Sequence, residues 1–192
     1  MRLELPSIHE ERDRLVPRFN QLHKNIIESK KVKKDEFGRD IITPDMIDNL
    51  AKTSFPPCMR SIHETVRRDH HLKHYGRLHY GLFLKSIGLT MEGALNFFRD
   101  EFTKNITPEK FEREYGYNIR YNYGKEGKRV NMSAYSCSKI INGNPPGPSE
   151  THGCPFRHFD EKNLTKFLKR CEISDTDSDL VRIAFNLLII LY

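Results

Sequence analysis

The hydrophobic positions of the chain recur at helical spacing along much of its length. Residues 10–30 carry apolar side chains three or four positions apart, which predicts one amphipathic helix there. The following stretch, residues 30–40, is charged and poor in apolar side chains, so we expect an exposed loop. Thr43 and Pro44 then supply an N-cap and a first-turn proline, which predict a helix through Leu50.

The next part of the chain predicts two helices in succession. The Pro56-Pro57 pair is expected to stop any helix before the cysteine that follows it. The pattern over residues 59–68 suits a short helix. Gly76 is expected to separate that helix from another, which Gly88 ends.

The second half of the chain alternates helix signals with one irregular stretch. Thr90 is expected to cap a helix with a strong apolar stripe, and Thr107 opens another helix that runs toward Tyr115. Residues 143–153 are rich in proline and glycine, which predicts an exposed connection without regular structure. A helix over residues 160–169 follows.

Composition bounds the class of protein. A chain of 192 residues is long enough for one sizeable core, so one compact domain is expected. Lys and Arg together number 32 against 26 acids, and the net charge of +6 favours polyanionic partners. No secretory signal is recognisable, and the apolar run over residues 184–192 is too short to span a bilayer.

Cations and aromatic side chains are interleaved in two stretches of the chain. In the first stretch, residues 67–85 hold five Lys and Arg side chains and one acid, among several His and Tyr. The second stretch, residues 115–129, repeats the mixture with one intervening acid. Cations can follow a sugar-phosphate backbone while aromatic rings stack on unpaired bases, so we expect a single-strand or duplex-end binder. The alternative for any one residue is a core tyrosine or a solvated cation.

The four cysteines lie at positions 58, 137, 154 and 171, separated by 79, 17 and 17 residues. This spacing differs from the compact pairs of common zinc modules, so spacing alone is a weak metal signal. Dispersed thiolates can still converge on an iron-sulfur cluster, and buried inert thiols are the alternative. His70 and His74 could share one helical face, but solvated or phosphate-facing histidines are the better interpretation. No nucleophile elbow, phosphate-binding glycine loop or paired-carboxylate polymerase site is present.

Several motifs occur in the order found in one known family. The first group comprises Ser54-Phe-Pro-Pro-Cys-Met-Arg60, His70-His-Leu, Gly76-Arg77, Tyr80-Gly-Leu-Phe-Leu-Lys85 and Gly88-Leu89. The second group comprises residues 115–120 (Tyr-Gly-Tyr-Asn-Ile-Arg), 124–129 (Gly-Lys-Glu-Gly-Lys-Arg) and 152–157 (His-Gly-Cys-Pro-Phe-Arg). Together they resemble the C-terminal iron-sulfur domain of the eukaryotic DNA primase large subunit.

This resemblance implies a mainly α, single compact helical domain with short irregular or β segments around a cysteine-ligated 4Fe-4S cluster. It implies a nuclear, non-catalytic accessory subunit that binds template DNA and the 5′ end of the RNA primer at the start of DNA replication. The implied protein partners are the primase small catalytic subunit, which carries the polymerase site, and DNA polymerase alpha; no membrane is implied.

The family's functional residues map onto this sequence by position. Three cluster cysteines match Cys58, Cys137 and Cys154. The nucleic-acid-binding motifs contain Lys73, Arg77, Tyr80, Lys85, Tyr115 and Tyr117. Further contacts are expected from His71, His74 and Asn118. Lys73 stands where an arginine is familiar, which keeps the charge but loses the planar guanidinium.

Two departures from the family pattern modify these expectations. The preceding helical domain that docks the small subunit has no counterpart here, so docking of that subunit is in question. The family's fourth cysteine belongs well beyond Cys154, whereas Cys171 lies too early to match it. We therefore predict a domain over residues 1–180 and a divergent apolar tail over 181–192, as in a fragment, a splice form or a mispredicted gene product.

Two other interpretations stay open. One is a zinc-dependent single-strand nucleic-acid-binding module, and the other is a truncated, non-functional fragment of primase. An enzyme acting directly on nucleic acid would need a carboxylate or metal site that the sequence does not offer.

Overall fold

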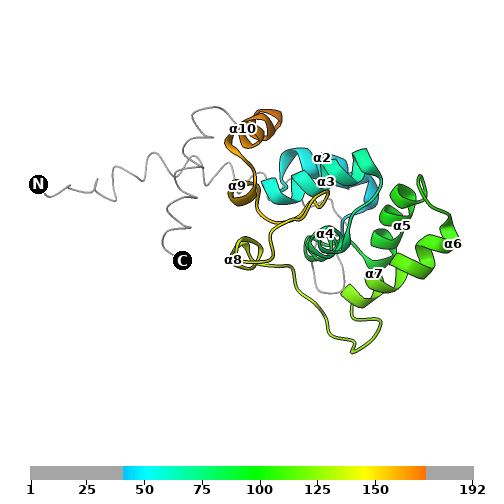
Figure 1. Ribbon diagram of the computed structural model, residues 1–192. Coiled ribbons are helices and arrows are strands. Elements are labelled where there is room, and N and C mark those ends of the chain that lie inside the picture. Colours follow the sequence, from blue (N-terminus) through cyan, green and yellow to red (C-terminus); the bar gives the residue numbers. More distant parts are fainter. Residues whose placement is uncertain (1–40, 172–192) are drawn as a thin grey trace, which may run out of the picture. The chain divides into compact units, whose positions relative to one another are not determined.

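The computed structural model describes residues 41–171, and this part of the chain is mainly helical (Figure 1). In chain order the elements are η2 (Pro44–Met46), α2 (Ile47–Thr53), α3 (Pro57–Asp69), α4 (His74–Ser86), α5 (Met91–Phe102), α6 (Pro108–Phe111), η3 (Glu112–Gly116), α7 (Tyr117–Asn122), α8 (Cys137–Ile141), α9 (Pro155–His158) and α10 (Glu161–Arg170). Within residues 41–171 the β pairing is a single parallel bridge between Ile42 and Leu89. The predicted mainly α fold class is confirmed.

Some predictions lie outside the described residues. These are the helix over residues 10–30, the loop over 30–40 and the tail over 181–192. The domain boundaries 1–180 and 181–192 therefore stay predictions. Within the described part, no helix has the length and apolar character needed to cross a bilayer.

The Pro56-Pro57 pair begins a helix. The preceding helix, α2, already ends at Thr53, and Pro56 is the N-cap of α3 while Pro57 occupies its first position. Proline suits this position because its missing N–H would have no partner inside the helix and its φ is already helical. As a result, Cys58 lies in the first turn of α3.

The predicted break at Gly76 is wrong. Gly76 lies within α4, and the chain turns earlier, at His70, whose φ of 50° is left-handed and ends α3. Gly76 serves a packing role, because a Cβ at this position would lie 2.7 Å from the carbonyl oxygen of Thr151. The glycine therefore lets the connection after α8 pack directly on the first turns of α4.

Two predicted N-caps are confirmed around α5 and α6. The Thr90 hydroxyl accepts a hydrogen bond from the Gly93 N–H at 3.0 Å, and the Thr107 hydroxyl accepts one from the Lys110 N–H at 3.3 Å. The helix predicted after Thr107 is interrupted by a π-helical turn, η3, which separates α6 from α7. Such turns are rare and occur often at functional sites, and η3 contains Tyr115.

Helix α4 lies at the centre of the described residues and packs against α3, α5 and α7 (Figure 1). The main core is built from apolar side chains of these helices, including Val66, Leu84, Phe98 and Phe102, which are all at most 2% exposed. A smaller core under α10 contains Leu164, Phe167 and Leu168. The connection predicted over residues 143–153 is irregular, as expected, but the predicted exposure is wrong at its end, where His152 and Gly153 are buried.

Candidate nucleic-acid groove and cysteine cavity

A cavity of about 190 Å³, called the groove below, lies between α4, α5 and the η3–α7 segment. Four of the predicted nucleic-acid-binding residues line it, namely His74, Arg77, Tyr115 and Asn118. The first two come from α4 and the last two from η3 and α7. Segments some forty positions apart in the sequence thus present a cation, two rings and an amide to one space.

Arg77 is the half-buried cation of the groove. Its guanidinium lies over the Tyr115 ring, 4.7 Å from the centroid, and Nη1 donates a hydrogen bond to the Leu72 carbonyl oxygen at 2.5 Å. Burial lowers the pKa of Arg77, although a guanidinium stays protonated at neutral pH. Among the described residues no carboxylate is paired with Arg77, so its charge is available to an anion.

His71 and Lys73 flank this cation. His71 Nε2 lies 3.3 Å from the Tyr115 hydroxyl, and the Lys73 ammonium donates to the carbonyl oxygen of Pro148 at 3.1 Å. Burial and then the nearby charges of Arg77 and Lys73 lower the pKa of His71. Arg77 and Lys73 therefore supply the positive charge at this edge of the groove, and His71 adds a hydrogen-bonding ring.

Two side chains of α7, Tyr117 and Asn118, add an aromatic ring and an amide beside the groove. Tyr117 is 47% exposed, and its ring stacks on Tyr121 with centroids 6.3 Å apart. Asn118 donates from Nδ2 to the Glu114 carbonyl oxygen at 3.3 Å, which leaves its carbonyl end available. An exposed ring beside a cationic groove can stack on a base.

Tyr80 is buried and Lys85 is half-buried, and neither lines the groove. Tyr80 is fully buried, and its hydroxyl lies 2.6 Å from His63 Nδ1. The Lys85 ammonium donates to the carbonyl oxygens of Asn122 and Met132 at 2.6 and 2.7 Å, and to the Asn131 side chain at 2.5 Å. Both side chains therefore hold the elements that form the groove and do not line it.

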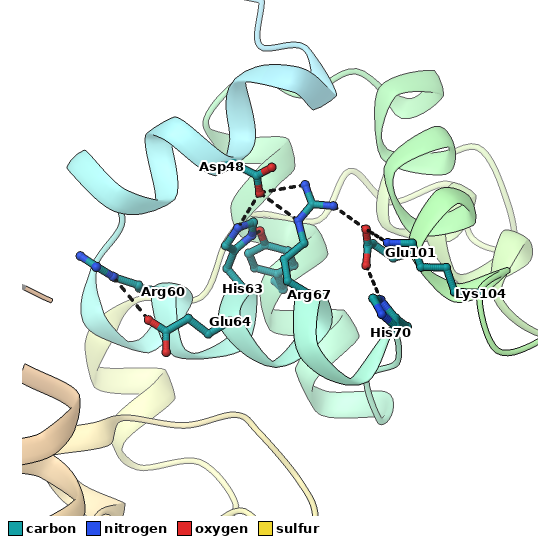
Figure 2. A network of polar contacts seen from close by, with 9 residues as sticks. Asp48, Arg60, His63, Glu64, Arg67, His70, Glu101 and Lys104 are labelled. Atoms are coloured by element: carbon teal, nitrogen blue, oxygen red, sulfur yellow. Dashed lines mark hydrogen bonds and ion pairs between the residues drawn. The ribbon is translucent and has the colours of Figure 1, made fainter. Parts of the chain in front are cut away.

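The basic stripe predicted over residues 67–85 is interrupted by acids. Arg67 donates to Glu101 at 2.5 Å and pairs with Asp48 at 2.8 Å, while Arg68 pairs with Asp69 at 2.7 Å; of these, only the contacts of Arg67 are drawn in Figure 2. Sequence reasoning missed Asp48 and Glu101 because each lies on another helix, 19 and 34 positions from Arg67. The charge available to a ligand is therefore that of Arg77 and its neighbours.

Glu101 is a buried acid on α5 with three hydrogen-bonding partners. It is 2% exposed and accepts hydrogen bonds from Arg67, from His70 at 2.8 Å and from Lys104 at 2.9 Å (Figure 2). Burial opposes its ionisation, but the hydrogen bonds from Lys104, His70 and Arg67 together lower the pKa of Glu101. Because His70 is the left-handed residue that ends α3, Glu101 fixes the turn that presents His71. An acid inside the apolar stripe of α5 was the available sequence signal.

A second, apolar cavity of about 80 Å³ brings three cysteines together. Its lining consists of Pro56, Pro57, Cys58, Cys137, Ile140, Ile141, Cys154, Pro155 and Phe156. Cys58 lies in the first turn of α3, Cys137 begins α8, and Cys154 is the N-cap of α9. Burial, and next the proximity of Cys154, raise the pKa of the Cys58 thiol to about 11.

The donor set of this cavity fits an iron-sulfur cluster. Three soft sulfur ligands meet in an apolar, proline-bounded pocket, although such a cluster ordinarily takes four cysteines. Cys171 is not part of the lining; it packs beside Phe167 and Leu168 of α10. Over residues 41–171, no three His, Cys, Asp or Glu side chains are grouped so as to hold a single metal ion. Of the three thiols, Cys154 is buried, Cys58 is half-buried and Cys137 is exposed. When bound, a cluster would supply the positive charge that stabilises their thiolates.

Gly153, next to Cys154, has a backbone conformation that favours glycine. Its φ is +80°, and a Cβ would lie 2.8 Å from the His158 ring. We expect Gly153→Ala to lower the free energy of unfolding by about 1–3 kcal/mol, because a left-handed conformation and the clash both add strain. Gly147→Ala is the matched control in the same connection, since Gly147 is outside the left-handed region. Urea unfolding of the two variants measures the difference, and equal losses would contradict the role assigned to Gly153.

Comparison with known proteins identifies the class. Residues 48–187 match the family described as the C-terminal domain of the large subunit of eukaryotic and archaeal DNA primase. This chain belongs to that family, in agreement with the helical fold and the motif order.

The relatives are primase large subunits from distant organisms. The chain is 49% identical over 164 residues to the probable DNA primase large subunit of Arabidopsis thaliana, covering 85% of this chain and 36% of that protein. It is 46% identical over 171 residues to the DNA primase large subunit of Homo sapiens, covering 88% of this chain and 33% of that protein. For the protein of Saccharomyces cerevisiae the identity is 35% over 178 residues, covering 88% and 34%. The chain thus spans about a third of the length of these relatives.

Proposed function

We propose that this chain is the nucleic-acid-binding part of a primase large subunit, which binds template DNA and the 5′ end of the RNA primer. The observation that carries this proposal is the convergence of Arg77, Tyr115, His74 and Asn118 on one groove. Membership of the primase family supplies the class of nucleic acid.

Each side of the groove suits one chemical part of the ligand. Arg77 is held in place by Tyr115 and by the Leu72 carbonyl, so its guanidinium is preorganised to contact a phosphate. Lys73 adds positive charge at the same edge, which suits the phosphates of a primer 5′ end. The exposed Tyr117 ring is placed to stack on an unpaired template base.

A further cationic surface continues from the groove along the segment after α7. Lys125, Lys128 and Arg129 lie on this segment, and all three are exposed. Exposed cations on an irregular segment favour contacts with a sugar-phosphate backbone without reading its sequence. We assign this segment to the template strand beyond the junction with the primer.

In this proposal the three cavity cysteines hold a 4Fe-4S cluster that acts as a structural staple. Cys58, Cys137 and Cys154 come from three short or terminal helical turns that are far apart in the sequence. Tying them together would fix α8 and α9 against α3, and α9 packs on α3 already. The fourth ligand is not among the cavity residues.

The proposal assigns a binding role to this chain and polymerase chemistry to the primase small subunit. The expected protein partners are that small subunit and DNA polymerase alpha, and the expected compartment is the nucleus. The basis for these partners is the family, whose relatives are called primase large subunits.

Variants at Arg77 and Tyr117 test the groove directly. We expect Arg77→Ala to weaken binding of a primer-template junction about tenfold and to reduce the salt slope of log K by about 0.7–0.9, because one phosphate contact is lost. Tyr117→Ala should weaken binding by about 1–3 kcal/mol with little change of slope, because stacking releases few counterions. Fluorescence anisotropy at several salt concentrations measures both.

Arg77→Lys is the control for charge, since it keeps the cation but loses the planar stack on Tyr115. It should retain most of the salt slope and lose part of the affinity. Equal slopes for Arg77→Ala and Tyr117→Ala, or wild-type affinity of both, would contradict the proposed groove.

A further inference from the structure

His79 is a buried histidine of α4 that the groove does not use. It is 8% exposed, and its Nδ1 atom is buried without a hydrogen-bond partner among the described residues. Burial, followed by the charges of His152 and Lys139, lowers the pKa of His79 to about 4. At neutral pH the side chain is therefore an uncharged aromatic ring inside the protein.

This ring lies against the two chain segments that carry the cysteines of α8 and α9. The His79 and Tyr135 ring centroids are 4.9 Å apart at an angle of 71°, and the His79 and His152 centroids are 5.5 Å apart at 81°. Tyr135 precedes Cys137 by two residues, and His152 precedes Cys154 by two residues. One ring of α4 thus contacts both segments edge-on, close to their cysteines.

Other contacts hold the same two segments to α4 and to one another. Tyr75 lies 5.2 Å from His152 between ring centroids, and Gly76 allows the backbone of Thr151 to approach α4. The Lys139 ammonium lies 3.7 Å above the Tyr135 ring. His79 is the member of this group that contacts both Tyr135 and His152.

The two segments need such support because little regular structure fixes them. Cys137 follows an irregular stretch and begins a helix of five residues, and Cys154 follows another irregular stretch and precedes a helix of four residues. The spacing of their sulfur atoms therefore depends on side-chain packing more than on backbone hydrogen bonds. Groups behind the ligands of a metal centre commonly set ligand orientation in this way.

We propose that His79 is a positioning residue for the cysteine cavity, where its ring clamps the segments of Cys137 and Cys154 at the spacing that an iron-sulfur cluster requires. This inference rests on the cluster in the proposed function. Helix α4 would then have two roles, because it presents Arg77 to the groove and His79 to the cysteine segments.

The test uses the full chain, purified without oxygen, in four forms: wild type, His79→Ala, His79→Phe and Leu84→Ala. Leu84 is the matched control because it is fully buried on the same helix and does not line the cysteine cavity. Iron and acid-labile sulfide per chain are measured first. The rate of iron loss to a chelator and the visible absorption spectrum follow, with circular dichroism as the check on folding.

We expect His79→Ala to lose iron about tenfold faster than wild type, at the low end of the effects of removing an outer-shell partner. His79→Phe should restore a rate near that of wild type, because it restores an uncharged ring. Leu84→Ala should lose iron at the wild-type rate even though its core is less stable.

Each outcome decides between the two proposals. If folded His79→Ala loses iron at the wild-type rate, the role of His79 is overturned while the cluster stays in place. The same conclusion follows if Leu84→Ala loses iron as fast as His79→Ala. Fast loss from His79→Phe would also overturn it, since the ring would then not be what matters. Wild-type protein without iron and sulfide would instead remove the cluster itself, and the role of His79 with it.

Discussion

Replacing Cys58, Cys137 or Cys154 by serine is expected to remove nearly all iron and acid-labile sulfide from the protein, whereas Cys171→Ser leaves both unchanged. The three cysteines line one cavity, and Cys171 packs elsewhere, under α10. A serine hydroxyl is a harder ligand with a much higher pKa than a thiol, so it does not replace a thiolate on iron. Metal and sulfide analysis of anaerobically purified variants measures the result.

Cys171→Ser is a demanding control because it also removes one half-buried thiol. Loss of iron from this variant equal to the loss from Cys154→Ser would contradict the three-cysteine assignment. Zinc without sulfide in the wild-type protein would favour the alternative of a zinc-dependent nucleic-acid-binding module. Iron with sulfide in the wild-type protein would exclude that alternative.

Glu101→Gln is expected to reduce the free energy of unfolding by about 2–3 kcal/mol. The substitution removes the only charge that faces Arg67, His70 and Lys104 from α5 among the described residues. Breaking a fully buried ion pair costs about 3–5 kcal/mol, and the partial exposure of Arg67 and Lys104 reduces that value. For a chain of this size the midpoint of thermal unfolding should fall by roughly 5–10 °C.

Asp48→Asn is the matched control for Glu101→Gln. Asp48 pairs with Arg67 and His63 in the same network, but its side chain is 56% exposed (Figure 2). An exposed pair contributes less than about 1 kcal/mol, so this variant should unfold close to the wild type. Equal losses for the two variants, measured by urea unfolding, would show that burial of Glu101 does not decide the stability of the network.

Local signals in the sequence were sufficient to predict most helices. They were insufficient to predict the roles of Gly76 and of the Pro56-Pro57 pair. The caps at Thr90 and Thr107 depend on neighbouring residues alone, and both helices begin where predicted. Gly76 was assigned to a break because glycine is a weak helix former. Its actual role depends on Thr151, which lies far along the chain and approaches only in the folded protein.

The sequence predicted some residues of the groove correctly and others wrongly, and the physical reason differs between the two groups. Arg77, Tyr115 and Asn118 line the groove, and the stretches that contain them were recognised from interleaved cations and rings. Tyr80 belongs to the same stretch, but position within a helix decides which side chains face the core, and Tyr80 faces His63. A mixture of residue types does not distinguish the two faces of α4.

The cysteine cavity could not be derived from spacing. Separations of 79 and 17 residues carry no geometric information, because the positions of α3, α8 and α9 depend on long-range packing. The three cysteines Cys58, Cys137 and Cys154 were predicted from the resemblance to the family. The structure places these three around one cavity. The ring of His79 behind two of them had no signal in the sequence.

The central claim is that this chain recognises a primer-template junction, and equilibrium binding of the wild-type protein tests it most directly. The ligands are an RNA–DNA duplex with a 5′-phosphorylated RNA end beside a single-stranded template, the same template alone, and a blunt duplex. We expect the junction to bind at least about tenfold more tightly than either control at the same salt concentration, because only the junction occupies both the Arg77 edge and Tyr117. Equal affinity for the junction and the single strand would contradict the account.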